Sequence, residues 1–393
     1  MLALALFSPL LVAPAEAGPV FTEASAEVYL DDNGNWPRAY PYNDGWMVFH
    51  AGGGDYQLTH AHADLSPDRT DDRALTGRTD LKDHDVRPCP DGTFLHVATA
   101  DFVPQGHDSA YSWRYDADAH LISNGTIAEA DTSGSVYVDM PGVCGNHFQG
   151  ALFEYPPSSP GRFVEIGPDG SPGALHDMEG SPASNGSSLL EDLDGTLWIS
   201  GSPPHGPWTD FSFVHYDTAF NLLGSVEVPV VDAGQTAIQP QTTIRVGNTY
   251  IVAYLYSAYS ESKVLDLALA AFDQDWNLID NIQLSENSGT VGGMTPYVVY
   301  DGHGSLLALY AKDLQNYAFT VTLDPSVYDV VVDTGTPPDT STDSPSDSES
   351  GSDTWVDAKP GCGCATSTPG GPMLALMIAG AAATACRRRD LAG

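Results

Sequence analysis

Two series of turns recur along residues 20–332 of this sequence, and both have a period of about 52 residues. The turns of the first series contain a glycine and precede a short apolar segment, as in "NDGWMVFH" and "LDGTLWIS". Their glycines are Gly45, Gly92, Gly145, Gly195, Gly247 and Gly304. The second series lies in phase with the first, at Asp64, Asp116, Gly167, Asp217, Asp273 and Asp324. Two independent series with one period predict a chain built from six structural repeats.

Each repeat contains four short segments rich in Val, Ile, Tyr, Phe and Leu, separated by a tight turn, a polar loop and an Asp-rich turn. These residues favour β-strands, and no long helical period is present. Four antiparallel strands repeated six times are typical of an all-β, six-bladed β-propeller, which we predict for residues 18–332. Either "SAEVYL" at residues 25–30 or "YDVVVDT" at residues 328–334 could complete the last blade. A pair of β-sandwich domains is the structural alternative.

Cys89 and Cys144 each stand just before the glycine turn of successive repeats. In a propeller, these positions belong to the innermost strands of neighbouring blades, at the same end of the ring. Export to an oxidising compartment favours a disulfide bond between them, which we predict. The alternative is a pair of buried free thiols.

The two ends of the chain predict export and display. Residues 1–17, "MLALALFSPLLVAPAEA", combine an apolar core with the small-x-small pattern of a signal-peptide cleavage site. Residues 333–360 are rich in Ser, Thr, Pro and Asp, which predicts a disordered acidic stalk. The apolar run of 14 residues at Met373–Cys386 makes a helix about 21 Å long, whereas a bilayer core is about 30 Å thick. We therefore expect a processed tail rather than a permanent membrane span.

Residues 361–393 begin with Gly-Cys-Gly-Cys, continue with the short apolar run and contain three arginines near their end. This combination resembles the MYXO-CTERM sorting tail of myxobacterial surface proteins. The resemblance implies that a sorting protease cuts near the cysteine motif. It also implies that lipid on Cys362, or else on Cys364, anchors the mature protein in the outer envelope at the cell surface. An ordinary C-terminal membrane helix is the alternative.

The charge of the chain limits its partners. It has 52 acidic and 15 basic residues, a formal net charge of −37. Such a surface repels nucleic acid and anionic lipid, so we expect neither as a partner. It favours neutral ligands or ligands bridged by cations.

The loops between second and third strands and between blades are long and polar, and we expect them to gather on one face of the ring. They contain aromatic residues that could stack on sugar rings and polar groups that could orient a ligand. The candidate ligand-binding residues are Tyr56, His84, His107, Trp208 and Tyr256. We therefore predict a surface-anchored binding or adhesion module, with a glycan or another polar molecule as its ligand.

A secreted hydrolase or lyase acting on polysaccharide is the main alternative, and a structural envelope component is the third hypothesis. His84 lies between Asp83 and Asp85, which could tune it as an acid or base, and these three are the candidate catalytic residues. The sequence has no Gly-x-Ser-x-Gly nucleophile elbow, phosphate loop or dinucleotide fingerprint. Binding without turnover is therefore the favoured interpretation.

Two segments have metal-like spacing. "HAHAD" places His60 and His62 on one face of a strand, which can bind zinc or copper when further ligands come from elsewhere. "DQDWNLID" has oxygen ligands at a calcium-like spacing, namely Asp273, Asp275, Asn277 and Asp280. Because it lacks the glycine and glutamate of a complete calcium loop, we favour a hairpin turn there and expect no cofactor, with calcium as the one candidate.

The segment "DLDGTLWIS" is similar to the aspartate-box turns of sialidases, which are also propellers, but Leu193 stands where the box has an aspartate. Arg38, Arg87 and Arg245 could form an anion-binding cluster. Their distances from the following glycine turns are seven, five and two residues. These unequal distances predict different heights on the ring and argue against such a cluster.

Overall fold

The structure is a computed structural model that describes most of the repeat region. The described residues are 19–31, 37–52, 55–71, 75–76, 81–102, 107–129, 142–153, 162–179, 188–202, 208–258, 265–286, 295–313 and 315–328. All of them belong to the first of two compact units, Met1–Val332. The predicted signal peptide, the stalk and the tail with Cys362 and Cys364 lie outside the described residues.

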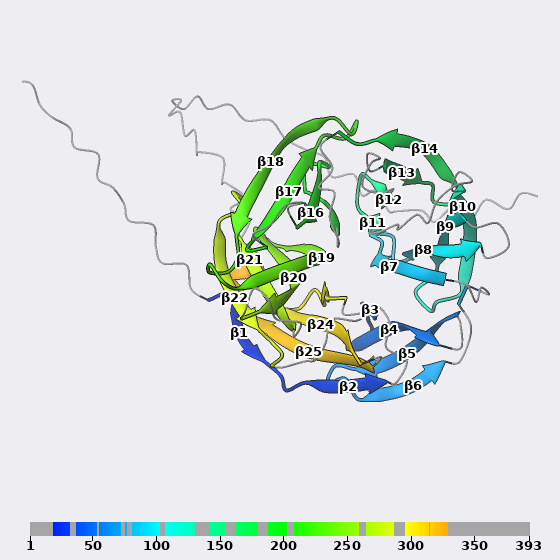
Figure 1. The fold of residues 1–393 in the computed structure, drawn as a ribbon. Helices are drawn as coiled ribbons and strands as arrows, with labels where there is room; N and C mark the ends of the chain where they lie inside the picture. Colours follow the sequence, from blue (N-terminus) through cyan, green and yellow to red (C-terminus); the bar gives the residue numbers. More distant parts are fainter. Residues whose placement is uncertain are drawn as a thin grey trace, which may run out of the picture. The chain divides into compact units, whose positions relative to one another are not determined.

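Six antiparallel sheets follow one another around a common centre, which confirms the all-β, six-bladed propeller (Figure 1). Each sheet is a blade, numbered in chain order and written from its innermost strand outward. Blade 1 contains β3 (Arg38–Tyr42), β4 (Gly45–Gly52), β5 (Asp55–His62) and β6 (Pro67–Asp71). Blade 2 contains β7 (Leu81–Pro88), β8 (Phe94–Phe102), β9 (His107–Tyr115) and β10 (Leu121–Glu129). Blade 3 contains β11 (Gly142–Cys144), β12 (Gln149–Phe153), β13 (Arg162–Ile166) and β14 (Pro172–Asp177).

The second half of the ring repeats this order. Blade 4 contains β15 (Ser188–Glu191), β16 (Leu197–Gly201), β17 (Asp210–Tyr216) and β18 (Leu222–Pro229). Blade 5 contains β19 (Thr236–Val246), β20 (Thr249–Ser257), β21 (Asp266–Phe272) and β22 (Leu278–Gln283). Blade 6 contains β23 (Tyr297–Tyr300), β24 (Ser305–Lys312) and β25 (Gln315–Leu323), followed by the short helix α1 (Pro325–Tyr328). No helix in these described segments is long and apolar enough to cross a membrane.

The N-terminal segment completes blade 6. Both β1 (Phe21–Ala24) and β2 (Val28–Asp31) pair antiparallel with β25, so "SAEVYL" contributes to the last blade, whereas residues 329–334 of "YDVVVDT" lie outside the described residues. The carboxylate of Asp280 in blade 5 accepts hydrogen bonds from the backbone N–H groups of Val20 (2.7 Å) and Phe21 (2.9 Å). Each innermost strand contacts the next around the ring, from β3 to β23 and back to β3. Ring closure therefore pairs the two ends of the propeller and protects its sheet edge.

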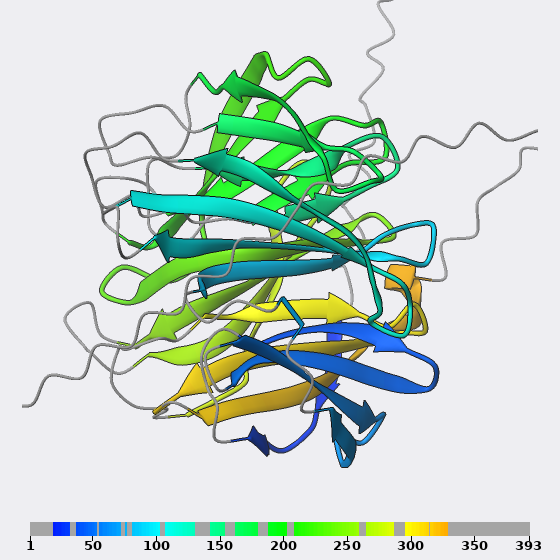
Figure 2. The ribbon, with the colours of Figure 1, turned by 90° about the vertical axis from the view of Figure 1, so that its right-hand side faces the viewer.

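The strands run between two faces of the ring (Figure 2). We call the face with the connections from first to second and from third to fourth strands the turn face. The opposite face, with the connections from second to third strands and between blades, is the loop face. On the turn face, local hydrogen bonds shape the tight turns. The carboxylate of Asp194, for example, accepts from both the backbone N–H and the hydroxyl of Thr196, and Gly195 has a φ of 83°, which glycine adopts without strain.

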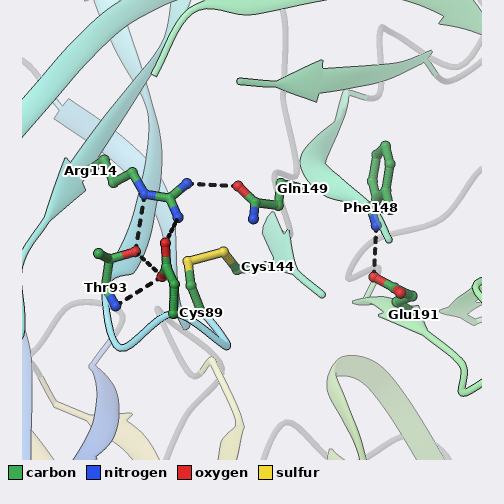
Figure 3. The surroundings of a disulfide bond; sticks show 8 residues. Cys89, Thr93, Arg114, Cys144, Phe148, Gln149 and Glu191 are labelled. Carbon is green, nitrogen blue, oxygen red and sulfur yellow. Dashed lines mark hydrogen bonds and ion pairs between the residues drawn. A yellow bond between two sulfur atoms is a disulfide. The ribbon is translucent and has the colours of Figure 1, made fainter. Parts of the chain in front are cut away.

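Six hydrophobic clusters form the core, one between each pair of neighbouring blades. At the junction of blades 2 and 3, the predicted disulfide joins Cys89 and Cys144, with Cα atoms 4.9 Å apart (Figure 3). Next to it, the buried guanidinium of Arg114 in blade 2 donates to Gln149 in blade 3 (2.7 Å) and to Asp91 (2.7 Å). The turns therefore bring the two cysteines to the same face, as the repeat predicted.

Candidate functional site

A groove of about 520 Å³ lies between the outer strands of blades 4 and 5. This volume is typical of small-molecule sites. The connection from β18 to β19 forms one side of the groove, and side chains of β20 and β22 form the other. Its lining residues are Pro229, Val230, Val231, Asp232, Gln235, Tyr254, Tyr256, Leu278, Asn281 and Gln283.

Hydrogen bonds hold part of this lining in place. The amide of Asn281 accepts a hydrogen bond from the Tyr254 hydroxyl (2.8 Å) and donates one to the carbonyl of Val230 (3.1 Å). The side chain of Gln283 is fixed in the same way, because its Nε2 donates to the carbonyl of Ser285 (2.8 Å). Both amides are therefore held in place. Asn281 links the two sides of the groove, and Gln283 is bonded within blade 5.

Two groups in the groove remain available to a ligand. The Tyr256 ring packs partly buried against the aromatic core of blades 4 and 5, and its hydroxyl makes no hydrogen bond to any described residue. The Asp232 side chain is exposed, and its carboxylate likewise has no partner among the described side chains. The groove thus combines an aromatic ring, a phenol and an acceptor that can take hydrogen bonds from ligand hydroxyl groups.

Trp208, a second predicted ligand-binding residue, lies beside this groove. Its side chain is 53% exposed. Its backbone carbonyl accepts a hydrogen bond from Ala237 (2.6 Å), just after the connection that lines the groove. The structure thus brings Trp208 and Tyr256 to one blade junction on the loop face.

A second group of polar side chains meets where the innermost strands approach the centre. Arg38 and Tyr297 are the first residues of β3 and β23, and Asp85 and Arg87 lie in β7. We call these four residues the axial cluster. The Tyr297 hydroxyl lies 3.2 Å from the Ala39 carbonyl of blade 1 and 2.9 Å from the Val86 carbonyl of blade 2. Tyr297 therefore links three blades, and burial raises its pKa to about 12, which keeps it protonated at neutral pH.

The candidate catalytic histidine is buried in a different environment from the one expected. The imidazole of His84 is 2% exposed, stacks on Tyr56 with ring centroids 3.8 Å apart, and lies 3.1 Å from Nε2 of His96. Burial, aided by the positive charge of Arg38, lowers the pKa of His96 to about 3. Tyr56 is also 2% exposed, so the expectation that its ring forms a surface platform is wrong. The alternation of side chains along β5 turns this ring into the junction of blades 1 and 2.

The two aspartates beside His84 do not both act on it. Asp85 points to the arginines of the axial cluster, with its Oδ2 2.8 Å from Nε of Arg87. The alternation of strand side chains separates it from His84. The side chains of Asp83 and His107 lie outside the part of the chain whose side chains are described.

The calcium-like segment forms the hairpin turn between β21 and β22. The carboxylate of Asp273 accepts from the backbone N–H groups of Asp275 (2.9 Å) and Asn277 (2.8 Å), and Asp280 binds the N-terminal segment instead. Among the described residues, no group of three or more His, Cys, Asp or Glu side chains could hold a metal ion. The segment is therefore the hairpin turn that the sequence favoured, and Asp280 after it holds the N-terminal segment.

The three candidate metal ligands of the "HAHAD" segment lie in different environments. His60 is buried and faces the ring of Tyr42, with centroids 5.4 Å apart, whereas His62 is exposed. The carboxylate of Asp64 accepts from Ser66 within its own turn. The segment is a blade strand followed by its turn.

The arginines are arranged differently from the expectation drawn from their spacing. Arg38 and Arg87 both approach Asp85, despite unequal distances from their glycine turns. Arg245 lies apart from them, paired with Asp192 and over the ring of Tyr250. The alternation of Asp85 and Arg87 along one inner strand was the sequence signal for this cluster. The sequence also offered Arg38 as a partner of Arg87, although the unequal spacing argued against it, and nothing in the sequence indicated Tyr297.

The sequence matches no protein-family model and no curated protein. Several solved structures are similar to the chain at low identity. A protein of unknown function from Dyadobacter fermentans has a TM-score of 0.56 and 10% identity, covering 77% of this chain and 99% of that one. An α-L-arabinofuranosidase from Fusarium graminearum has a TM-score of 0.46 and 10% identity, covering 77% and 99%. A DUF4221 member from Bacteroides vulgatus has a TM-score of 0.44 and 9% identity, covering 78% and 97%. The first likeness shows the fold, and none of them assigns a function.

Proposed function

We propose that this propeller is a binding module that holds a neutral oligosaccharide in the groove between blades 4 and 5. The observation that carries the proposal is that the Tyr256 hydroxyl and the Asp232 carboxylate, on a lining fixed by the Asn281 amide, have no hydrogen-bond partner in the described part of the chain. Sugar rings present hydroxyl groups to such acceptors and apolar faces to aromatic rings. Trp208 could extend this contact beyond the groove.

Charge supports a neutral ligand over an anionic one. The chain has a net charge of −37, and Asp232 adds a carboxylate to the groove itself. Polyanions would be repelled both at long range and at the site. Ligand hydroxyl groups, in contrast, can donate directly to Asp232.

The lining favours binding without turnover. A glycoside hydrolase of the usual kind needs two carboxyl groups about 5–10 Å apart across the scissile bond. Asp232 is the one carboxylate among the described residues that line the groove. The groove can therefore orient a sugar but lacks a paired acid and nucleophile from this set.

We also propose that the module is displayed at the cell surface after export and tail processing. The signal-like residues 1–17, the stalk and the resemblance of residues 361–393 to a sorting tail support this. Mass spectrometry of the C-terminus of the native protein tests it. We expect a membrane-associated protein that lacks Arg387–Arg389. An intact C-terminus on surface protein would contradict the sorting proposal.

Glycan-array screening of the full chain, followed by titration calorimetry on the best neutral oligosaccharide, tests the binding function. We expect Tyr256→Phe and Asp232→Asn each to weaken binding by about fivefold or more, because the first removes the hydroxyl and the second replaces a charged acceptor oxygen by an NH2 group. Asp44→Asn is the matched charge control, since Asp44 is exposed on the turn face of blade 1, and it should bind as wild type does. Binding that neither groove variant alters would disprove the site. Release of shortened oligosaccharide by wild-type protein would show a hydrolase instead.

A further inference from the structure

The axial cluster contains more positive charge than its own carboxylate neutralises. Arg38 and Arg87 are 7% and 8% exposed, and Asp85 is 3% exposed. His96 adds no charge, because burial and the positive charge of Arg38 lower its pKa to about 3. The described side chains of the cluster therefore carry two positive charges and one negative charge. Burying a net charge is costly unless a partner compensates for it.

The carboxylate of Asp85 is already saturated. Its Oδ2 accepts from Nε of Arg87 (2.8 Å) and from the backbone N–H of Gly142 in blade 3 (2.9 Å). Its Oδ1 accepts from the backbone N–H of Val86 (3.0 Å) and lies 3.3 Å from Nε of Arg38. Three hydrogen bonds and the ion-pair contact with Arg38 thus surround the two oxygens, so Asp85 leaves other guanidinium N–H groups unsatisfied.

Two buried arginine nitrogens have no hydrogen-bond partner among the described residues. They are Nη2 of Arg87 and Nε of Arg38, the latter because its contact with Asp85 lacks hydrogen-bond alignment. Among the described residues, neither guanidinium donates to the Tyr297 hydroxyl, which contacts the backbone carbonyls of Ala39 and Val86 instead. The guanidinium carbons of Arg38 and Arg87 lie 5.0 and 5.6 Å from the centre of its ring. The tyrosine therefore supports the two cations from one side without using their N–H groups.

We propose that Arg38 and Arg87 form a second binding site, at the ring centre, for a small monoanionic carboxylate. One negative charge would bring the cluster to neutrality, whereas a dianion would leave an excess. A planar carboxylate also matches the donor geometry of a guanidinium. Asp85 and Tyr297 act as positioning residues, which hold the two guanidinium groups together. This site is separate from the groove, so the proposal does not rest on the oligosaccharide function.

Acetate is the probe for this site. Saturation-transfer NMR and thermal melting of the full chain would be recorded across an acetate titration, with sodium chloride keeping the ionic strength constant. We expect saturable acetate binding to the wild type. Asp85→Asn should bind acetate at least tenfold more tightly, because it removes the competing negative charge while its amide oxygen still accepts from a guanidinium group. Arg87→Gln should bind at least tenfold more weakly.

Arg245→Gln is the matched control, because Arg245 also pairs with an aspartate but lies outside the cluster, and its acetate affinity should stay within twofold of wild type. If Arg87→Gln does not fold, comparing the acetate affinities of the wild type and Asp85→Asn still tests the proposal. Equal affinity in those two proteins, or no saturable binding in either, overturns the proposal. Tighter binding of phosphate than of acetate at pH 7 would overturn the assignment of a monoanionic carboxylate.

Discussion

The junction of blades 2 and 3 and the junction of blades 4 and 5 occupy equivalent places in the repeat, but different interactions hold them. The first has a small aliphatic cluster, the disulfide and the buried Arg114. The second has neither a disulfide nor a buried arginine among its described residues. It contains a large aromatic cluster centred on Trp276, whose ring lies 3.7 Å from that of Phe213 and 4.3 Å from that of Tyr250.

The packing at one position of the first junction is tight. A Cβ atom added at Gly142 in blade 3 would lie 2.9 Å from a methyl group of Val97 in blade 2, so this position has no room for a larger side chain. Covalent and polar contacts replace apolar area there. At blades 4 and 5, the aromatic rings bury enough area to hold the junction from within. The outer part of that junction can therefore keep an open groove.

Removing the central ring of the aromatic junction should have the largest effect. Trp276 is 3% exposed, so Trp276→Ala should lower the free energy of unfolding by about 3–5 kcal/mol through lost burial and a residual cavity. Urea denaturation followed by circular dichroism measures this. Trp208→Ala is the control for loss of a tryptophan, and it should change the free energy by about 0.5 kcal/mol or less because that ring is exposed. Equal effects would show that ring burial does not hold this junction.

Loss of the disulfide should come next. The bond spans 55 residues, and replacing Cys89 and Cys144 together by serine should cost about 2–4 kcal/mol, since the unfolded chain gains freedom. A reductant should destabilise the wild type by a similar amount and leave the double variant unchanged. Rapid labelling of both thiols in unreduced, folded protein would contradict the bond.

The polar contact of the same junction should contribute less. The side chain of Arg114 is 3% exposed, and Arg114→Ala leaves Gln149 and Asp91 without their partner, which should cost about 2 kcal/mol. Arg162→Ala is the control, because its ion pair with Asp177 is largely exposed, and it should cost about 0.5 kcal/mol. Chemical denaturation of both variants at pH 7 measures the difference. Similar losses would mean that Arg114 does not link the blades.

Acid should have the smallest effect, a slight loss of stability at the junction of blades 2 and 3. Hydrogen bonds from Thr93, with a contribution from Arg114, lower the pKa of Asp91 below its usual 3.8. This stabilisation is present above about pH 4 and is lost as the pH falls through the lowered value, because the unfolded state then binds the proton more readily. Melting curves between pH 5 and pH 2.5 should fall less steeply for Asp91→Asn than for the wild type. Its half-exposed side chain keeps the effect below about 1 kcal/mol. Parallel curves for the two proteins would contradict this.

Local chemistry let the sequence predict the architecture. The Asp-x-Thr and glycine turns form through hydrogen bonds within a few residues, as at Asp194 and Thr196, so their spacing reported the number of blades before any tertiary contact was known. The pairing of Cys89 with Cys144 followed from the same period, because equivalent positions of neighbouring repeats lie at the same face of the ring.

Only the tertiary structure decided which side chains meet. Arg38, Asp85 and Tyr297 come from three blades, and no local pattern records how the inner strands approach one another once the ring closes. The sequence predicted that the Tyr56 ring lies at a surface loop, but its position in β5 stacks it on the buried imidazole of His84. The choice of the closing strand was also tertiary, because both terminal segments can form strands and Asp280 of blade 5 binds the N-terminal one. Turn chemistry is short-range and can be read along the chain, whereas the neighbours of a buried charge depend on ring closure, which brings together residues far apart in sequence.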